Sequence, residues 1–455
     1  MIPGKYIKFR NLVLLFTSLI FYGWGEPRYI YVMIVTIIID YIGGFLIDKY
    51  HGDRKKAKTV LVVTIIINLA ILGFFKYYNF IAANLRLIPG MEFIPNMDIV
   101  LPIGISFYTF QALSYVIDIY RKTASVQKNI VSFGTYITLF PQLIAGPIIR
   151  YFDVDKMFRE RSETVMLFAS GIRTFIAGLA KKVLLANTAW QLWESFKALP
   201  DEYRTVVGSW MGMFFFGFHI YFDFSGYSDM AIGLGKMFGF KFLENFNYPY
   251  ISKSITEFWR RWHISLSTWF REYVYFPLGG SRRSSFITFR NLLIVWLLTG
   301  FWHGASWNFI LWGLYYFILL VIEKAFLLKL LNKIPAVFRH IYTLLFVLFG
   351  WLLFTAENLE IGMQYLQNMF GFALKTQETS GFISSLDIYD IIRNLVFVAI
   401  MVIAATPYPK RLFYRYYQKS QTLKLAAYIA GIAIFILCTA YLVDTSFNPF
   451  LYFRF

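Results

Sequence analysis

Residues 291–322 read NLLIVWLLTGFWHGASWNFILWGLYYFILLVI, two apolar stretches separated by a short break that contains His303. A helix needs about 20 predominantly apolar residues to cross a bilayer, with a range of about 17–25. The second stretch, 304–322, therefore predicts a membrane helix. The first, 291–303, is short and predicts a partial or re-entrant helix. This part of the chain is typical of a membrane protein rather than of a soluble domain.

Similar apolar stretches recur along the whole chain. Further candidate spans are approximately 11–24, 29–47, 59–80, 99–119, 165–186, 206–234, 340–356, 391–406 and 425–443. The stretch 131–149 contains Pro141 and Pro147 and predicts a second partial helix, because irregular backbone at membrane depth is tolerated only where protein or water surrounds it. We expect one all-α integral-membrane domain over residues 1–455.

Composition agrees with a membrane protein. The chain is 58% hydrophobic and only 15% charged, which leaves too little polar surface for a soluble domain of this length. Its formal net charge of +18 comes from basic residues in short clusters between apolar stretches. That distribution follows the positive-inside rule and suits contact with membrane lipid, and we do not expect nucleic-acid binding. The single cysteine, Cys438, lies in an apolar stretch, and no His, Cys and carboxylate residues cluster with ligand spacing, so we expect no metal site.

Basic clusters predict the orientation of the chain. We expect them to be cytoplasmic, and they comprise Lys5/Lys8/Arg10, Lys49/Arg54/Lys55/Lys56/Lys58, Arg121/Lys122/Lys128, Arg260/Arg261/Arg271/Arg282/Arg283, Lys324/Lys329/Lys333/Arg339 and Lys410/Arg411/Arg415/Lys419/Lys424. Loops near 81–98 and 357–390 are poor in Lys and Arg and belong on the opposite side, as does the C-terminal tail. An expected loop at 181–204, with Lys181 and Lys182, fits this map least well.

Residues 251–285 alternate aromatic and basic side chains at roughly helical spacing. This pattern is typical of an amphipathic helix that lies at the membrane interface, anchored by Trp and Arg.

Three of the five histidines are candidates for chemistry. His303 lies at probable membrane depth between Gly300 and Gly304, where an ionisable side chain is costly and usually functional. Those glycines would let a backbone or a thin substrate approach closely. The alternative is a structural histidine bonded to a neighbouring helix. His263 follows Trp262 in the amphipathic segment, and alone it would suit an interfacial anchor.

The pair of His303 and His263 is more informative than either member. Acyl transfer to a hydroxyl needs a base that works near neutral pH, and histidine is the usual supplier. A second polar group must polarise a thioester carbonyl or hold the acceptor. We therefore expect His303 and His263 to act together.

His219, Asp223 and Asp229 form a further polar set. His219 and Asp223 are four residues apart and share one face of a helix. Both aspartates would need partners if buried, and His219 or an arginine are candidates. We favour a structural polar network between helices over a catalytic role.

Several motifs, in order along nearly the whole chain, resemble the MBOAT superfamily, in particular its bacterial alginate O-acetyltransferase branch, related to the D-alanyl transfer protein of teichoic acid modification. The motifs are LPIGISFYTFQ at 101–111, FPQLIAGP at 140–147, YFDFSGYSD at 221–229, WRRWHISLS at 259–267 and WHG at 302–304. The resemblance implies a ring of about ten to twelve transmembrane helices, with re-entrant segments, around a central funnel or tunnel. It places the essential histidine on His303 and a second position on His263. The supporting residues implied around the tunnel are Asp223, Asp229, His219, Trp302 and Asn308.

The resemblance also implies the reaction and its partners. A thioester donor, acetyl-CoA, would bind as substrate from the cytoplasmic side, with no bound cofactor, and its phosphates would meet Arg260, Arg261 and Arg271. The acetyl group would leave on the outer face of a bacterial cytoplasmic membrane. An extracytoplasmic SGNH-hydrolase-like acetyltransferase would then pass it to a polysaccharide.

The C-terminal tail, residues 447–455, reads FNPFLYFRF. It resembles the end of a small partner protein of the D-alanylation system, which makes Tyr452 a candidate covalent acyl carrier activated by His303. A hydrophobic anchor is the alternative interpretation of this tail.

Three other functions remain open from the sequence. The same fold could transfer D-alanyl or other acyl groups, or acylate lipid or protein. Buried acids at Asp40, Asp223 and Asp229 with broken helices also suit a transporter or channel. A non-catalytic scaffold fits less well, because it leaves the paired histidines unexplained.

Overall fold

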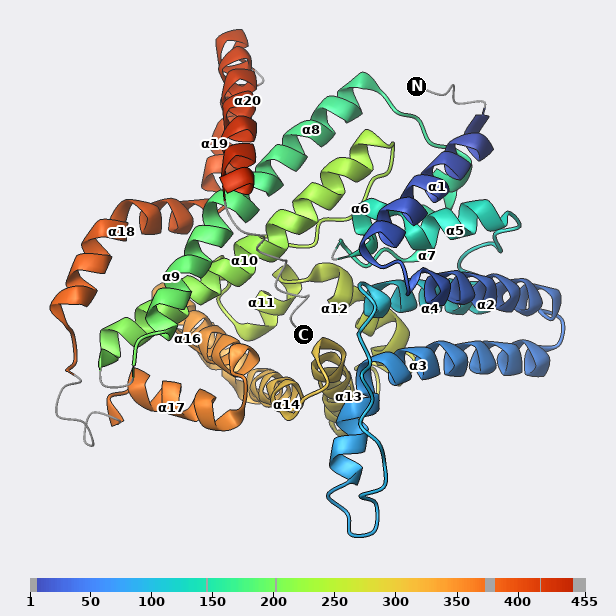
Figure 1. Cartoon of the computed structure of the whole chain (residues 1–455), viewed down its shortest axis with the longest axis horizontal. Coiled ribbons are helices and arrows are strands. Elements are labelled where there is room, and N and C mark those ends of the chain that lie inside the picture. The colour runs from blue at the N-terminus through green and yellow to red at the C-terminus, as the bar shows by residue number, and fades with distance from the viewer. Residues whose placement is uncertain (1–5, 145, 201–202, 373–380, 418, 445–455) are drawn as a thin grey trace. The chain divides into compact units, whose positions relative to one another are not determined.

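The computed structural model describes residues 6–144, 146–200, 203–372, 381–417 and 419–444 (Figure 1). Every regular element in these ranges is a helix, which confirms the all-α class. Tyr452 and the tail at 447–455 lie outside the described residues.

The chain divides into two compact units. Unit 1 comprises residues 1–175, 230–244 and 268–278, and unit 2 comprises residues 176–229, 245–267 and 279–455. Three helices continue along the chain from one unit into the other, namely α8 (Val165–Ala180), α10 (Val206–Met237) and α12 (Ile264–Phe270). The expectation of a single domain over residues 1–455 stays a prediction.

Unit 1 is built around three neighbouring helices. Its elements are α1 (Ile7–Gly25), α2 (Ile30–Lys49), α3 (Arg54–Leu85), α4 (Ile105–Arg121), α5 (Ile130–Thr138), α6 (Phe140–Leu143), α7 (Tyr151–Arg159) and the π-helical turn η5 (Arg271–Tyr275). α2 packs against both α3 and α4, and α1 packs against α5 (Figure 1). Close approach of α2 depends on two glycines, because a side chain at Gly43 would overlap Thr64 of α3 and one at Gly44 would overlap Tyr115 of α4.

Unit 2 holds the remaining helices. Its elements are η2 (Lys181–Ala186), α9 (Asn187–Lys197), η4 (Pro249–Ile251), α11 (Ile255–Arg261), α13 (Ser285–His303), α14 (Trp307–Ile322), η6 (Glu323–Leu327), α15 (Leu328–Leu331), α16 (Ala336–Thr355), α17 (Leu359–Met369), α18 (Ser385–Ala404), α19 (Tyr408–Tyr417) and α20 (Gln421–Asp444). α14 packs against α13 and α16, and α11 packs against α14 and α16.

The α13–α14 hairpin is held together by backbone contact. A Cβ atom at Gly300 would overlap the carbonyl of Phe309, and one at Gly313 would overlap the carbonyl of Trp296. The close approach expected at Gly300 is therefore made by a neighbouring helix. Small residues at such contacts are typical of helix packing within membranes.

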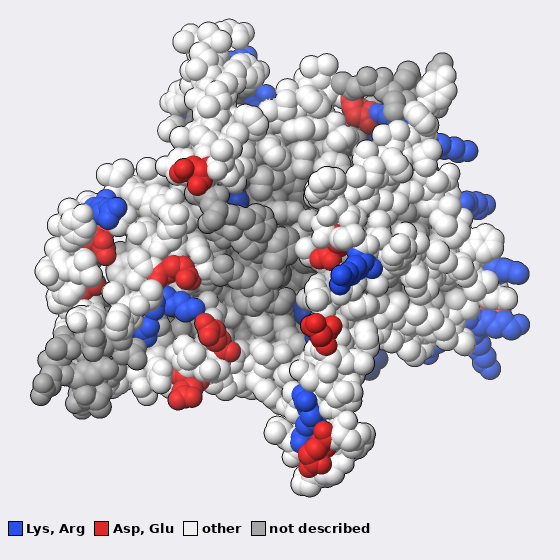
Figure 2. Space-filling view, in the orientation of Figure 1, with Lys and Arg blue, Asp and Glu red and all other residues white. Residues whose placement is uncertain are grey.

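Five described helices are long and apolar enough to cross a membrane: α2, α3, α13, α16 and α20. α18 and α19 together meet the same criterion but are bent by 70°. The other expected spans lie in helices that are shorter or more polar. Figure 2 shows Lys and Arg gathered at the edge where α2 connects to α3, while uncharged residues cover most of the rest of the described face.

Three expectations about local structure were wrong. Residues 291–303 belong to a continuous helix, α13, because its first turn begins in the polar residues from Ser285 onward. The expected loop at 181–204 begins instead as the π-helical turn η2, followed by α9. Lys181 and Lys182 therefore lie within a helical segment, which explains why they fit the loop-charge map poorly.

The third correction concerns residues 251–285. They do not form one interfacial helix but two seven-residue helices, α11 and α12, with η4 before them and η5 after them. Trp259, Trp262 and Trp269 are buried. These rings pack inside the protein. The conformation of this segment is therefore determined by their burial and not by an amphipathic pattern at the membrane interface. The prediction of a broken helix at 131–149 is confirmed, because α5 ends at Thr138 and α6 begins at Phe140.

Candidate active site

His303 lies at the last residue of α13 and is buried among aromatic rings of unit 2. Its ring centroid is 5.0 Å from that of Trp302, 5.0 Å from that of Trp312 on α14 and 5.3 Å from that of Phe354 on α16. Three helices therefore position this imidazole in an apolar environment.

His263 lies between α11 and α12 and contacts the same cluster. Its ring centroid is 6.0 Å from that of Trp302 and 4.7 Å from that of Phe224 on α10. Trp302 thus contacts both histidines, and the pairing expected from the sequence is present within one unit. His263 has a φ of 44°, a left-handed conformation that is uncommon for a residue other than glycine and often occurs at functional sites.

Asn245 fixes the His263 turn. Its Oδ1 atom lies 3.2 Å from His263 Nδ1 and accepts hydrogen bonds from Ser265 N at 3.1 Å and Ser265 Oγ at 2.9 Å. Its backbone carbonyl also accepts from Ile264 N at 2.9 Å. Three side-chain bonds and one main-chain bond therefore hold the left-handed turn in place.

These contacts assign the proton on His263. An oxygen that already receives two donors from Ser265 is an acceptor, so His263 Nδ1–H donates to it. His263 Nε2 is then the unprotonated nitrogen, and it is buried without a hydrogen-bond partner among the described residues. His263 lies outside the helices long enough to cross a membrane, and burial lowers its pKa to about 3. The imidazole is consequently neutral near pH 7 and offers a lone pair at Nε2.

Glu323 positions the helix that precedes His263. It is fully buried in η6 and accepts hydrogen bonds from Ile255 N at 2.6 Å and Thr256 N at 2.8 Å, at the start of α11. Thr256 Oγ1 and Tyr342 Oη donate to it as well. A carboxylate at a helix N-terminus satisfies main-chain donors that lack a partner within the helix. Glu323 therefore anchors α11 and, through it, the His263 turn.

Sequence reasoning missed Asn245 and Glu323. The available signals were a pair of asparagines, Asn245 and Asn247, in an aromatic segment, and an acid directly after the apolar stretch that ends at 322. Neither signal identifies a partner, because the partners are distant in sequence.

Buried donors lie beside His303. Trp312 Nε1, Trp259 Nε1 and Tyr316 Oη are buried and have no hydrogen-bond partner among the described residues. Trp312 contacts His303 directly, and its ring centroid is 5.1 Å from that of Tyr316 and 5.5 Å from that of Trp259. Buried N–H and O–H groups usually have partners, so this cluster is suited to bind a polar ligand atom.

Comparison with known proteins identifies the family. Residues 120–365 match the model of the membrane-bound O-acyltransferase family, MBOAT. The chain is 38% identical to the probable alginate O-acetylase AlgI of Azotobacter vinelandii, over 100% of this chain and 95% of the relative. The chain belongs to the membrane-bound O-acyltransferase family. This acyltransferase is also 35% identical to the peptidoglycan O-acetyltransferase of Helicobacter pylori, over 80% of this chain and 74% of the relative. It is 28% identical to the teichoic acid D-alanyltransferase of Bacillus subtilis, over 69% of this chain and 82% of the relative.

The acidic residues of this acyltransferase form ion pairs with lysines. Asp223 is fully buried and pairs with Lys182, and Asp229 pairs with Lys181 at 2.6 Å. The π-helical turn η2 presents both lysines to α10. α8 and α10 approach each other closely at this point, and a Cβ at Gly226 would lie only 2.7 Å from the Gly178 carbonyl oxygen. The expected structural network is present, with two lysines that the sequence analysis had placed in a loop.

His219 contacts the segment formed by η2 and α9. Its Nδ1 atom lies 3.0 Å from the carbonyl oxygen of Ala186, and its ring centroid is 4.8 Å from that of Trp190. Asn308 Nδ2 donates to the carbonyl oxygen of Ala356 at 2.6 Å, which joins the start of α14 to the end of α16. Asn308 thus supports the wall around His303.

The predicted donor-binding arginines differ in their surroundings. Arg260 is exposed, whereas Arg261 pairs with Glu257 at 2.9 Å and donates to the carbonyl oxygen of Asn247 at 3.0 Å. Arg271 lies in unit 1, beside Glu272. In the part of the chain that the structure describes, no group of three or more His, Cys, Asp or Glu could hold a metal ion.

Proposed function

We propose that this acyltransferase takes an acetyl group from acetyl-CoA on the cytoplasmic side and delivers it for O-acetylation of an extracytoplasmic polysaccharide. The proposal rests on the contact of His303 and His263 with Trp302 inside one buried cluster. The names of the O-acetylating relatives support the acetyl group and a polysaccharide acceptor.

The geometry suggests separate roles for the two histidines. His303 acts as general base and removes the proton of the acceptor hydroxyl. His263 Nε2 carries no proton and can only accept a hydrogen bond, so it orients the substrates through another N–H or O–H group, because the single proton of the acceptor hydroxyl goes to His303. Trp312 N–H and its neighbours are placed to donate to the carbonyl oxygen of the thioester as negative charge develops there.

The chemical step balances without a metal or a redox partner. The acceptor oxygen attacks the thioester carbon, and a C–O bond forms as the C–S bond breaks. The proton taken by His303 passes to the departing CoA thiolate. Arg260, with Arg261 and Arg271, would attract the CoA phosphates from the cytoplasmic side.

The remaining parts of the proposal concern location and relay. The protein lies in the bacterial cytoplasmic membrane, with its basic loops inside and its C-terminus outside. Tyr452 is the candidate first acceptor, and a separate SGNH-hydrolase-like acetyltransferase passes the acetyl group to the polysaccharide.

The first test is mass spectrometry of the purified protein incubated with labelled acetyl-CoA. We expect label on the C-terminal peptide of wild type and none on His303→Ala or Tyr452→Phe. Thioester turnover that persists in Tyr452→Phe would support the acyltransferase activity and exclude Tyr452 as the acyl carrier. Turnover that does not depend on His303, with its partner protein supplied, would contradict the proposed mechanism.

A second candidate is D-alanyl transfer, which the similarity to a teichoic acid D-alanyltransferase favours. Here the donor is a thioester on a carrier protein. Supplying labelled D-alanyl carrier protein and labelled acetyl-CoA in parallel distinguishes the two donors. Label transfer from the D-alanyl carrier protein alone would support D-alanyl transfer and exclude acetyl transfer.

A further inference from the structure

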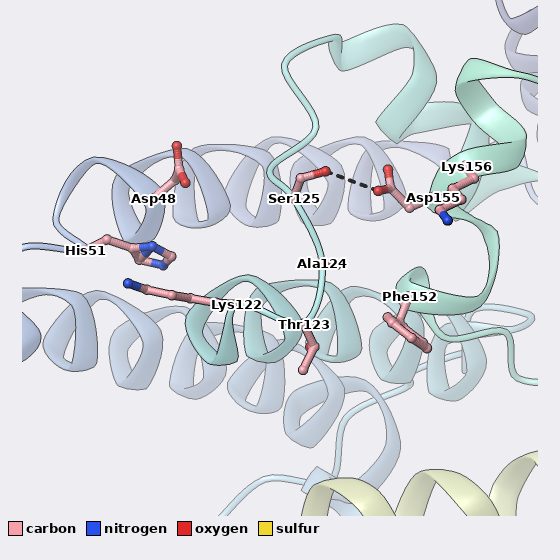
Figure 3. A pocket seen from close by; sticks show the side chains of 9 residues that line it. All are labelled: Asp48, His51, Lys122, Thr123, Ala124, Ser125, Phe152, Asp155 and Lys156. Atoms are coloured by element: carbon pink, nitrogen blue, oxygen red, sulfur yellow. Dashed lines mark hydrogen bonds between the residues drawn. The ribbon is translucent and has the colours of Figure 1, made fainter.

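A cavity of about 430 Å³ lies in unit 1, away from the residues of the candidate active site along the chain. It is lined by the end of α2, the residues that follow α4, and α7, with the side chains of Asp48, His51, Lys122, Thr123, Ala124, Ser125, Phe152, Asp155 and Lys156 (Figure 3). Most of its lining residues are polar or charged, which distinguishes it from the aromatic cluster around His303.

Some of these polar side chains already form hydrogen bonds within the protein. Asp155 accepts hydrogen bonds from Ser125 Oγ at 3.1 Å, Tyr151 Oη at 2.8 Å and Arg159 at 2.8 Å. His51 Nε2 lies 3.1 Å from the carbonyl oxygen of Ile119, which fixes its ring at the wall. Asp155 is thus satisfied, while the Nδ1 atom of His51 has no assigned bond.

Three charged side chains remain for a ligand. Among the described residues, Lys122, Lys156 and Asp48 form no ion pair and no side-chain hydrogen bond. Figure 3 shows the Lys122 side chain extended toward the His51 ring, with Asp48 on the adjoining helix. Lys156 lies at the other end of the cavity, beside Asp155, so Lys122 and Asp48 are the pair that could meet one ligand. One ammonium group and one carboxylate match a ligand that carries a phosphate and an ammonium group.

Lys122 also has an unfavourable backbone conformation. It has a φ of 60° and an ψ of 24° as the C-cap of α4, where glycine is the usual residue. A lysine adopts this conformation at a cost that glycine would avoid. Its conformational cost is consistent with a role for the ammonium group in the cavity.

A cavity at the connection of two membrane-crossing helices would lie at the level of the lipid headgroups. α2 and α3 are both long enough to cross a membrane, and the cavity is formed where α2 ends at Lys49, next to the start of α3 at Arg54. Exposed basic residues surround this end, as Figure 2 shows over the α2–α3 connection. The Phe152 side chain is 58% exposed at the cavity, which suits contact with acyl chains.

We propose that this cavity binds the headgroup of a phospholipid whose phosphodiester carries a primary ammonium group, as in phosphatidylethanolamine. Lys122 binds the phosphate, and Asp48 and the unprotonated Nδ1 of His51 accept hydrogen bonds from the ammonium group. The proposal does not depend on the proposed acetyl transfer.

The test is native mass spectrometry of the detergent-purified protein after delipidation and return of single lipids. Wild type should retain phosphatidylethanolamine over phosphatidylcholine, whose quaternary ammonium cannot donate to Asp48, and over phosphatidylglycerol, which has no ammonium. Lys122→Gly should weaken binding of phosphatidylethanolamine about tenfold, as expected for loss of one charged hydrogen bond. Asp48→Asn should abolish the preference over phosphatidylglycerol while leaving phosphatidylglycerol binding unchanged.

Two controls distinguish a loss of lipid binding from misfolding of the protein. Lys122→Gly relieves the left-handed backbone, so its thermal midpoint should be equal to or higher than that of wild type. Lys128→Ala removes a lysine from the same loop that does not line the cavity, and its lipid binding should match that of wild type.

Three outcomes would overturn the proposal. They are equal retention of all three lipids, an unchanged affinity in Lys122→Gly, and complete displacement of the lipid by soluble glycerophosphoethanolamine at equal concentration. The last outcome would assign the cavity to a soluble phosphate compound.

Discussion

Asn245 determines which nitrogen of His263 is available. In Asn245→Ala, His263 Nδ1–H loses its acceptor and the left-handed turn loses two further bonds. Loss of a buried hydrogen-bond partner costs about 1–3 kcal/mol, so we expect the rate constant for acyl transfer to fall about 10- to 100-fold. Single-turnover measurements with labelled acetyl-CoA would measure this change.

Asn245→Asp tests whether Asn245 acts by positioning His263 or only by stabilising the fold. A carboxylate keeps the same acceptor oxygen but adds negative charge, which favours the imidazolium form and raises the pKa of His263 from about 3. Acyl transfer should then be lost as pH falls through the raised value, so the acid side of the pH profile should move to higher pH than in wild type. A pH profile identical to that of wild type would show that Asn245 does not act through His263.

Trp312 contacts His303, and its buried Nε1 has no hydrogen-bond partner among the described residues. Trp312→Phe removes the N–H group and keeps an aromatic ring. If this group stabilises the developing oxyanion, the rate constant should fall about 100-fold, with little change in acetyl-CoA affinity. Trp296→Phe is the matched control, because the Trp296 ring packs against that of Trp312, with centroids 6.1 Å apart, and its N–H is not one of the donors of this cluster. An equal loss in both variants would indicate packing rather than catalysis.

At the scale of elements, α11 depends on a carboxylate from another helix. Glu323→Gln keeps the shape of the side chain but turns an amide donor toward the main-chain donors of Ile255 and Thr256. We expect a loss of about 1–3 kcal/mol in stability and a lower thermal midpoint in detergent. Acyl transfer should fall too, since α11 leads into the His263 turn.

Tyr342→Phe provides the control for Glu323. It removes one donor to the carboxylate and leaves the α11 cap intact. Its thermal midpoint should lie between those of wild type and Glu323→Gln. A Glu323→Gln protein as stable and active as wild type would exclude this anchoring role.

At the scale of the whole molecule, loop charge predicts orientation. α3 is long enough to cross a membrane, so the loop at 50–53 and the residues after Leu85 should face opposite sides. In a Cys438→Ser background, which removes the only cysteine, we introduce Lys56→Cys or Glu92→Cys. A membrane-impermeant thiol reagent applied to intact cells should label Glu92→Cys alone. Labelling of Lys56→Cys alone would reverse the orientation.

Local features of the sequence were sufficient for the class of the protein and for the histidine pair of its candidate site. Apolar stretches reveal membrane helices because each crossing needs its own hydrophobic length. His303 and His263 stood out because their motifs are short and contiguous. Predictions failed where packing overrides periodicity: the tryptophans at 259–269 are buried inside the protein, and Lys181 and Lys182 continue a helix.

The sequence by itself determined that this chain is a polytopic membrane protein of the acyltransferase family with a histidine pair. Only the tertiary structure decided how that pair is held. Asn245 and His263 are 18 positions apart, Lys182 and Asp223 are 41 apart, and Ile255 and Glu323 are 68 apart. Burial makes each of these polar groups require a partner, but its identity depends on which helices pack together, and no local pattern encodes that choice.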